Sequence, residues 1–215
     1  MKKYFLLYSL ILLAMISCQK DPDTSKLDND FPVSTNYDKS AVFSSYATFY
    51  IPDSVLVLDG NQTSRYWTDD NADRVVAAFV RNMESRGYTQ VNNRDSADLG
   101  LQVSYVEDVN YIYSGGYYDD PYWWWGYPGY WGPGYWGGWG GWYYPYTVGY
   151  SYAVGSLLAE MVDLDTAVAV DESSKLSVIW TAYMSGLLSG SSNFNNQLAV
   201  SAIDQAFAQS PYIKR

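Results

Sequence analysis

The stretch PYWWWGYPGYWGPGYWGGWGGWYYPY, residues 121–146, restricts the fold of this chain more than any other segment. It holds seven of the nine Trp residues, and Gly and Pro recur throughout it. Such helix breakers exclude a buried or membrane-spanning helix, and an open loop cannot lie in lipid because its backbone amides would be unpaired. We therefore predict a long, exposed and poorly ordered Gly/Trp/Tyr-rich insert over residues 111–146.

Three roles remain open for this insert. Its rings offer flat apolar faces to a glycan or to the surface of another protein. They also suit the lipid–water boundary, where Trp and Tyr are favoured, and a low-complexity spacer that self-associates is the third role. Binding ranks narrowly first, and the candidate binding residues are Trp123, Trp124, Trp125, Tyr127, Tyr130, Trp131, Trp136, Trp139 and Trp142.

The N-terminus indicates where the protein resides. Two lysines precede an apolar run over residues 4–16, which is too short to span a bilayer and is typical of a signal peptide. The run ends in MISC, residues 15–18, which resembles a bacterial lipobox. This resemblance implies cleavage after Ser17 and a diacylglycerol on the sulfur of Cys18, and two or more acyl chains anchor a protein stably.

The following residues predict a lipid-anchored protein of the outer membrane. The triplet Gln19-Lys20-Asp21 resembles the short export signal of some Bacteroidetes surface lipoproteins, so the periplasmic face and the cell surface both stay open. Residues 18–40 are polar with scattered Pro and Asp, which predicts a flexible tether. Residues 1–17 are expected to be removed as the signal peptide.

Composition excludes several function classes. The chain has 13 Lys and Arg against 23 Asp and Glu, with no cation between Arg94 and Lys175, so we predict no nucleic-acid partner. His is absent and Cys18 is the only cysteine, which removes the commonest general base and metal ligand. We expect no enzyme activity, no metal and no cofactor. The acyl groups on Cys18 are the only non-protein groups that we expect. The G-x-G-x-x-G match over 132–137 lacks the flanking strand and helix of a dinucleotide site, so no nucleotide is expected.

Acidic residues leave two weaker alternatives. The pairs Glu107-Asp108 and Asp119-Asp120 lie before the aromatic stretch, and carboxylates beside aromatic platforms are typical of glycoside hydrolysis. Neighbouring residues of a strand point to opposite faces, however, so such pairs do not converge by themselves. A second group lacks the spacing of a calcium loop and is better explained by turns; it comprises Asp163, Asp165, Asp171 and Glu172.

The hydrophobic pattern predicts elements on both sides of the insert. Strands are expected over residues 41–51, 88–91, 98–105, 148–164 and 175–187, with a long hairpin loop over 165–174. Helices are expected over 69–86, capped by Thr68 or Asp70 and ended by Gly87, and over 194–209.

Two of the strands have predicted faces. Strand 98–105 alternates, so Leu99, Leu101, Val103 and Tyr105 are expected to be buried, while Asp98, Gly100, Gln102 and Ser104 face water. In strand 175–187 one face is expected to hold Leu176, Val178, Trp180 and Ala182. The element order favours an α+β fold, with an antiparallel sheet of about four to five strands and two helices packed on one face. We place this domain at 41–212.

Several motifs occur together in an order that is similar to a known family. They are the strand ATFYI (47–51), Arg86-Gly87-Tyr88, Ala97-Asp98-Leu99, the Gly/aromatic insert, and LSVIW (176–180) before a Ser-Gly turn. With the lipobox, they resemble the bacterial envelope lipoproteins of "domain of unknown function 4136". The resemblance implies an α+β envelope domain and no particular activity; family members often have Arg after the Trp, where Thr181 stands here.

These observations lead to one functional hypothesis and two alternatives. The hypothesis is a membrane-anchored envelope lipoprotein that presents its aromatic insert to a glycan or an envelope protein. The first alternative is a structural component of envelope assembly that acts through its sheet edge or helices, with an incidental insert. A glycan hydrolase that uses the acidic pairs is the weakest of the three.

Overall fold

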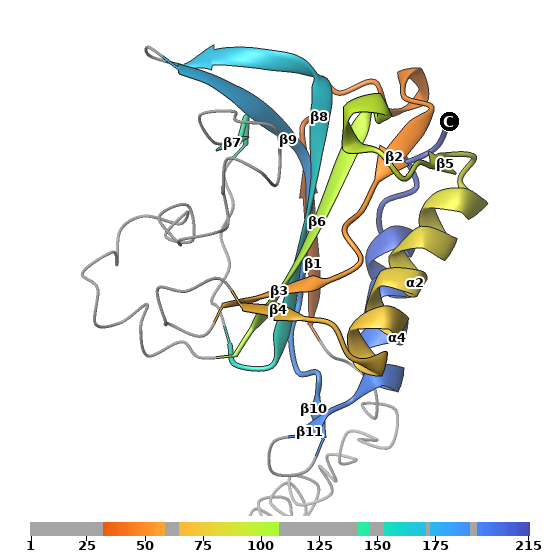
Figure 1. Cartoon of the computed structure of the whole chain (residues 1–215), viewed down its shortest axis with the longest axis vertical. Helices are drawn as coiled ribbons and strands as arrows, with labels where there is room; N and C mark the ends of the chain where they lie inside the picture. The colour runs from red at the N-terminus through yellow and green to blue at the C-terminus, as the bar shows by residue number, and fades with distance from the viewer. Residues whose placement is uncertain (1–31, 59–64, 108–141, 147–152, 171–172, 190–192) are drawn as a thin grey trace, which may run out of the picture. The chain divides into compact units, whose positions relative to one another are not determined.

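The fold is seen in a computed structural model, which describes residues 32–58, 65–107, 142–146, 153–170, 173–189 and 193–215 (Figure 1). In this part of the chain, nine strands form one mixed sheet. They are β1 (Val33–Tyr37), β2 (Thr48–Tyr50), β3 (Val55–Leu58), β4 (Arg65–Trp67), β5 (Thr89–Gln90), β6 (Leu99–Val106), β7 (Trp142–Tyr143), β8 (Ser156–Val170) and β9 (Ser173–Met184). A second small sheet pairs β10 (Leu188–Ser189) with β11 (Asn193–Phe194).

The described residues include helices α2 (Asp70–Ser85) and α4 (Asn196–Ala208), and both lie on the same face of the sheet (Figure 1). Short 3₁₀ turns precede β2 and β6, at Phe43–Ser45 and Arg94–Ser96. The α+β class and the position of both helices on one face are therefore confirmed.

The prediction of four to five antiparallel strands is wrong. The main path of the sheet is β1-β9-β8-β6-β2-β5, in which β2 runs parallel to β5 and β6. β3 also runs parallel to β6, further along the same strand, so β2 and β3 are two pieces of one interrupted strand. After β4, helix α2 crosses over one face of the sheet before the chain reaches β6, and such a crossover is what parallel strands require.

Local signals set both helices. Asp69 caps α2, because its side chain accepts hydrogen bonds from the N–H groups of Asn71 and Ala72; the predicted caps Thr68 and Asp70 are therefore wrong by one residue. Gly87 ends the helix with a φ of 94°, in the left-handed region that favours glycine. Asn195 caps α4 in the same way as Asp69 caps α2.

The hydrophobic core lies between the helices and the sheet. Val75 and Phe79 of α2 and Ile203 and Phe207 of α4 are completely buried against the strands. Trp180 of β9 is also completely buried, and its indole N–H donates to the hydroxyl of Ser210, 2.9 Å away. Burial of each such side chain stabilises the fold by about 1.5–3 kcal/mol.

The face of β6 that was expected to be wet is buried. Gly100, Gln102 and Ser104 are all buried, whereas Asp98 lies just before the strand and is half-buried. Strict alternation predicts a wet face only where one side of a sheet meets solvent, and here the central strands are shielded on both sides.

Irregularities in β8 and β9 explain two further corrections. Met161 pairs with Trp180, but Val162 pairs with Val178, so Ile179 is an extra residue in β9. This β-bulge places Val178 and Trp180 on opposite faces, contrary to the prediction that they share one. The predicted loop 165–174 is also wrong, since β8 and β9 continue through it and only residues 171–172 lie between them.

The N-terminal boundary of the domain moves toward the start of the chain. Residues 33–37, placed in the flexible tether 18–40, form β1 and pair antiparallel with β9. Their polar sequence, VSTNY, does not have the hydrophobic pattern that predicts a strand, although they lie at the edge of the sheet. The rest of the predicted tether up to residue 31, and the signal peptide, lie outside the described residues.

Candidate functional site

The structure describes few of the predicted site residues. Cys18 and the candidate binding Trp and Tyr residues between positions 123 and 139 lie outside the described part of the chain. Asp108, Asp119 and Asp120 lie outside it as well. Glu107 follows β6 and is exposed. Of the candidate binding residues, Trp142 alone lies in a described strand.

The end of the aromatic insert is part of the sheet. Trp142 and Tyr143 form β7 and run parallel to β9, opposite Leu176 and Ser177. The next residue, Tyr144, is only 7% exposed, and its ring meets that of Tyr146 edge-on at 6.2 Å. For residues 142–146, the prediction of an exposed and poorly ordered insert is therefore wrong, because strand pairing holds this end.

A row of polar residues crosses the sheet face opposite the helices. Gln102, Glu160 and Thr181 are directly paired across β6, β8 and β9, and Asn36 of β1 extends the row. Glu160 is completely buried, although a buried carboxylate is expensive unless hydrogen bonds satisfy it. Sequence reasoning missed this row, and the single charge within the apolar run LLAEMV was the signal that pointed to it.

Polar groups continue along the same face. Tyr183 is opposite Leu158 in the ladder, and its hydroxyl accepts a hydrogen bond from the N–H of Ala153 at 2.7 Å. The hydroxyl of Ser156 lies 2.9 Å from that of Tyr183. Burial raises the pKa of Tyr183, so it stays neutral and keeps its hydroxyl proton.

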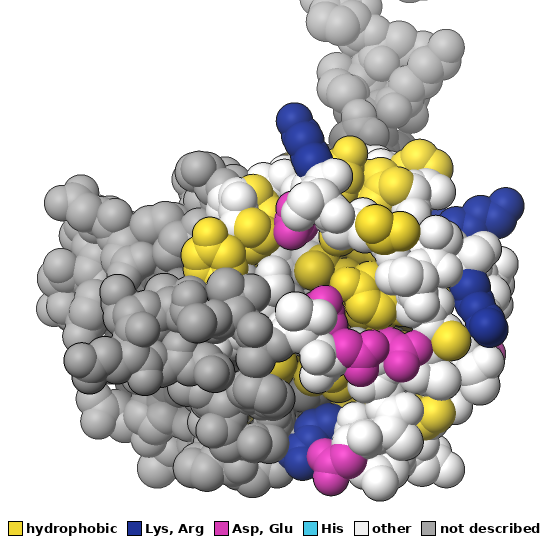
Figure 2. All heavy atoms as spheres, turned by 90° about the horizontal axis from the view of Figure 1, so that it is seen from above, with side chains coloured by type: hydrophobic (Ala, Val, Ile, Leu, Met, Phe, Trp, Pro, Cys, Tyr) yellow, Lys and Arg dark blue, Asp and Glu magenta, His cyan; other side chains and the backbone are white. Residues whose placement is uncertain are grey.

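The upper end of the sheet carries a group of carboxylates. Asp163 of β8 accepts hydrogen bonds from the hydroxyl of Tyr46 and from the N–H groups of Asp165 and Thr166. Asp98 accepts hydrogen bonds from the N–H groups of Ala47 and Thr48, at 2.6 and 2.9 Å. Figure 2, seen from above Figure 1, shows acidic side chains gathered beside hydrophobic ones at this end.

The surroundings raise the pKa of Asp165 and lower the pKa of Asp98. Partial burial raises the pKa of Asp165, and the charges of Asp98 and Asp163 raise it further. Burial also acts to raise the pKa of Asp98, but the hydrogen bonds from Ala47 and Thr48 and the charge of Arg215 outweigh it and hold this pKa below its ordinary value. Among the described residues there is no group of three or more acidic, His or Cys side chains that could hold a metal ion. The side chain of Asp163 accepts a hydrogen bond within its own turn, and turn chemistry was the predicted role of this residue.

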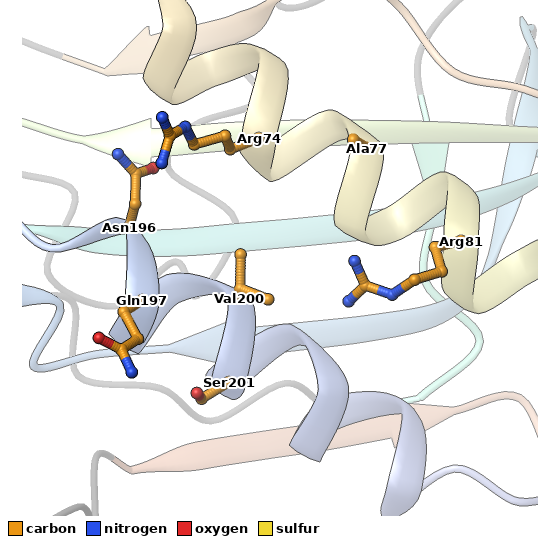
Figure 3. Close-up of a pocket in the computed structure, with 7 residues that line it drawn as sticks. All are labelled: Arg74, Ala77, Arg81, Asn196, Gln197, Val200 and Ser201. Carbon is orange, nitrogen blue, oxygen red and sulfur yellow. The ribbon is translucent and has the colours of Figure 1, made fainter.

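A groove of about 390 Å³ lies between the two helices. Figure 3 shows Arg74 and Arg81 of α2 reaching across it toward Asn196 and Val200 of α4. Arg81 is held by an ion pair with Asp204 at 2.7 Å, and Asn82 donates to the same carboxylate oxygen at 2.7 Å. Asn196 donates to the side-chain oxygen of Asn71, which joins the starts of the two helices. The groove therefore has a small apolar floor and a polar rim.

None of the described helices has the length and apolar character needed to cross a bilayer.

The fold and these features define an α+β domain with a mixed sheet, a helical layer on one face and an aromatic insert tied to that sheet. The model of the family "Domain of unknown function (DUF4136)" matches residues 33–212, and the chain belongs to this family. The match begins at the first residue of β1, which agrees with a domain that starts before the predicted boundary at residue 41.

Solved structures include a relative of substantial identity. The crystal structure of a DUF4136 family protein from Bacteroides thetaiotaomicron shares 47% sequence identity with this chain, with a TM-score of 0.77. The alignment covers 87% of this chain and 99% of that one, which also supports the Bacteroidetes-type assignment. A PelC dodecamer from Paraburkholderia phytofirmans has 11% identity and a TM-score of 0.39, over 86% of this chain and 98% of that chain. The comparison with curated proteins found no match.

Proposed function

We propose that this chain is a lipid-anchored protein of the bacterial outer membrane that binds a glycan or an envelope protein through the aromatic insert 111–146. The observation that carries this proposal is the parallel pairing of β7 with β9, which fixes the end of the insert to the domain. A stretch with seven Trp residues that is attached to a rigid sheet suits a binding surface, because aromatic rings supply large contact areas at low entropic cost.

The lipid anchor is tested at Cys18. The substitution Cys18→Ala removes the thiol that would carry the diacylglycerol, so we expect loss of radiolabelled palmitate incorporation and loss of the protein from the membrane fraction. Met15→Leu, which moves the lipobox toward its more usual sequence, is the matched control and should keep both. Palmitate labelling that persists in Cys18→Ala would refute the anchor.

The binding role is tested by replacing residues 110–139 with a Gly/Ser linker. The insert leaves the sheet after the end of β6, which is level with Met184 of β9, and returns at β7, which is level with Leu176. These two levels are roughly 25 Å apart at about 3.3 Å per residue. A linker of about 20 Gly/Ser residues has a root-mean-square length of roughly 25 Å and keeps β7 in place.

The readout is retention on a panel of insoluble polysaccharides and on purified envelope fractions. We expect at least tenfold weaker retention of the linker variant than of the natural chain. Tyr66→Ala is the matched control, because Tyr66 is an exposed aromatic residue outside the insert, at 38% exposure. Retention that survives the linker and recovers the same envelope proteins would favour the alternative, a structural role in envelope assembly through the sheet edge or the helices.

We infer no catalytic activity. Glu107 is the one described member of the acidic pairs, and it is exposed at the end of a strand. Turnover of any polysaccharide in the same panel that is lost on Glu107→Gln would contradict this inference.

A further inference from the structure

A bend in β8 lies at the point where the insert is attached. Asp163 is the last β8 residue before the bend, and it pairs with Ser177 of β9. The next β8 residue in the ladder is Ala167, opposite Leu176, so residues 164–166 bulge out of the sheet. Beyond the bulge, the rest of β8 and β9 forms a two-stranded arm that turns away from the line of the sheet (Figure 1).

β7 joins β9 at the level of this bend. Its partners are Leu176 and Ser177, the same two β9 residues that flank the bulge. β7 therefore lies where the arm leaves the sheet, and the aromatic insert returns to the domain at this point. A bulge of this kind re-aims a strand, and bulges recur beside functional sites.

Asp163 holds the bulge closed. The residue is 8% exposed, and one carboxylate oxygen accepts hydrogen bonds from the N–H groups of Asp165 and Thr166, at 2.9 and 3.0 Å. The other oxygen accepts the hydroxyl of Tyr46 at 3.0 Å. Leu164, inside the bulge, donates its N–H to the carbonyl of the residue before β6 at 2.9 Å. One carboxylate thus connects the bulge to the segment before β2.

The surroundings of Asp163 are acidic. Asp165 lies on the bulge itself, and Asp98 lies just before β6. Asp38, in the loop after β1, interacts electrostatically with Tyr46. The positive charge of Arg215 attracts the carboxylate of Asp98. The like charges of these carboxylates oppose the closed bulge, and the hydrogen bonds of Asp163 act against that repulsion.

We propose that Asp163 is a positioning residue, which locks the bulge at 164–166 and thereby fixes the direction of the β8–β9 arm and the attachment of the aromatic insert through β7. Its relevance to binding rests on the function proposed above, whereas the lock itself does not.

Amide hydrogen exchange of the purified chain tests the lock. We compare Asp163→Ala, Asp163→Asn and Tyr46→Phe with the natural chain at one pH and follow peptides that cover 142–143 and 174–177. Asp163→Ala removes the acceptor, so exchange there should rise at least tenfold while peptides of β6 and α2 stay unchanged. Asp163→Asn keeps one acceptor oxygen and should restore most of the protection. Tyr46→Phe removes a single bond and should give a smaller rise.

The control for charge is Asp165→Asn, which keeps every hydrogen bond of Asp163 and removes one repelling charge. It should leave exchange at 142–143 and 174–177 unchanged or slower. Unchanged exchange in Asp163→Ala, or a rise spread evenly over the whole domain, would overturn the proposal. The retention assay separates the two proposals: a local rise in exchange without retention of the natural chain on any glycan or envelope fraction would leave the lock standing and remove the binding role.

Discussion

Gly155, just before β8, permits a stability prediction whose magnitude follows from the geometry. Its φ is 78°, and a Cβ at this position would lie 2.3 Å from Cγ of Leu188 and within 2.8 Å of both its Cδ atoms. The left-handed conformation costs an alanine about 1–2 kcal/mol, and overpacking adds about 1–3 kcal/mol. We therefore expect Gly155→Ala to lower the free energy of unfolding by about 2–5 kcal/mol.

Gly87 is the matched control. It also has a positive φ, of 94°, but a Cβ there would approach only Cβ of Arg215, at 3.4 Å. Gly87→Ala should therefore show the conformational cost of about 1–2 kcal/mol with little steric cost. The difference between the two variants isolates the collision with Leu188.

Urea denaturation followed by circular dichroism measures both variants, together with Leu188→Ala and the double variant Gly155→Ala/Leu188→Ala. If the collision is real, the double variant is more stable than the sum of the single effects by about 1–3 kcal/mol, because removal of the leucine side chain makes room. Additive effects, or equal losses for the two glycine variants, would show that the steric reasoning is wrong.

Three further predictions concern single side chains. Ser210→Ala leaves the buried indole N–H of Trp180 without its acceptor and should cost about 1–3 kcal/mol in urea denaturation; no loss would contradict a need for that bond. The pKa of Asp98 is lowered in the fold, so its stabilisation is present above the ordinary value of 3.8 and is lost as the pH falls through the folded value. Asp98→Asn should therefore flatten the fall in Tm between about pH 4 and pH 2, and an unchanged slope would contradict this. Asp204→Ala removes an ion pair whose side chains are 56% and 51% exposed, so its cost should stay below about 1 kcal/mol and shrink at high salt; a larger, salt-independent loss would show that the contact to Asn82 dominates.

The helices were predictable because their signals are local. Asp69 and Gly87 mark the two ends of α2 within one or two residues, and the spacing of Val75 and Phe79 defines its buried face. Capping groups and helical periodicity depend on neighbours within a few positions of the chain. Such signals survive in a single sequence whatever the rest of the fold does.

The sheet was predictable only in its long strands. The parallel pairing of β2 and β3 with β6 depends on contacts across about 50 residues, and nothing local in Phe49 or Leu56 distinguishes a parallel neighbour from an antiparallel one. The extra residue at Ile179 reverses the faces of β9, and a period-two pattern cannot reveal a bulge. Short polar strands such as β1 carry too little hydrophobic alternation to be recognised.

The candidate site shows the same division. The aromatic composition of the insert was evident, but Trp142 and Tyr143 give no local sign that they pair with β9. Pairing of a two-residue strand is decided by the partner strand, here by the bend that brings Leu176 and Ser177 beside them. Composition therefore identified the segment, and tertiary structure determined where its end is held.

The attachment of β7 changes how a deletion of the insert should behave. Removal of the whole range 111–146 takes away both the pairing with Leu176 and Ser177 and the buried ring of Tyr144, whereas the linker variant that ends at residue 139 keeps them. Burial of a large aromatic side chain contributes about 2–3 kcal/mol, so the longer deletion should be less stable than the linker variant by at least about 2 kcal/mol. Urea denaturation of both variants measures the difference, and Tyr144→Ala within the linker variant should reproduce most of it. Equal stability of the two deletions would show that β7 contributes nothing to the domain, and would remove the structural basis for attaching the insert to the sheet.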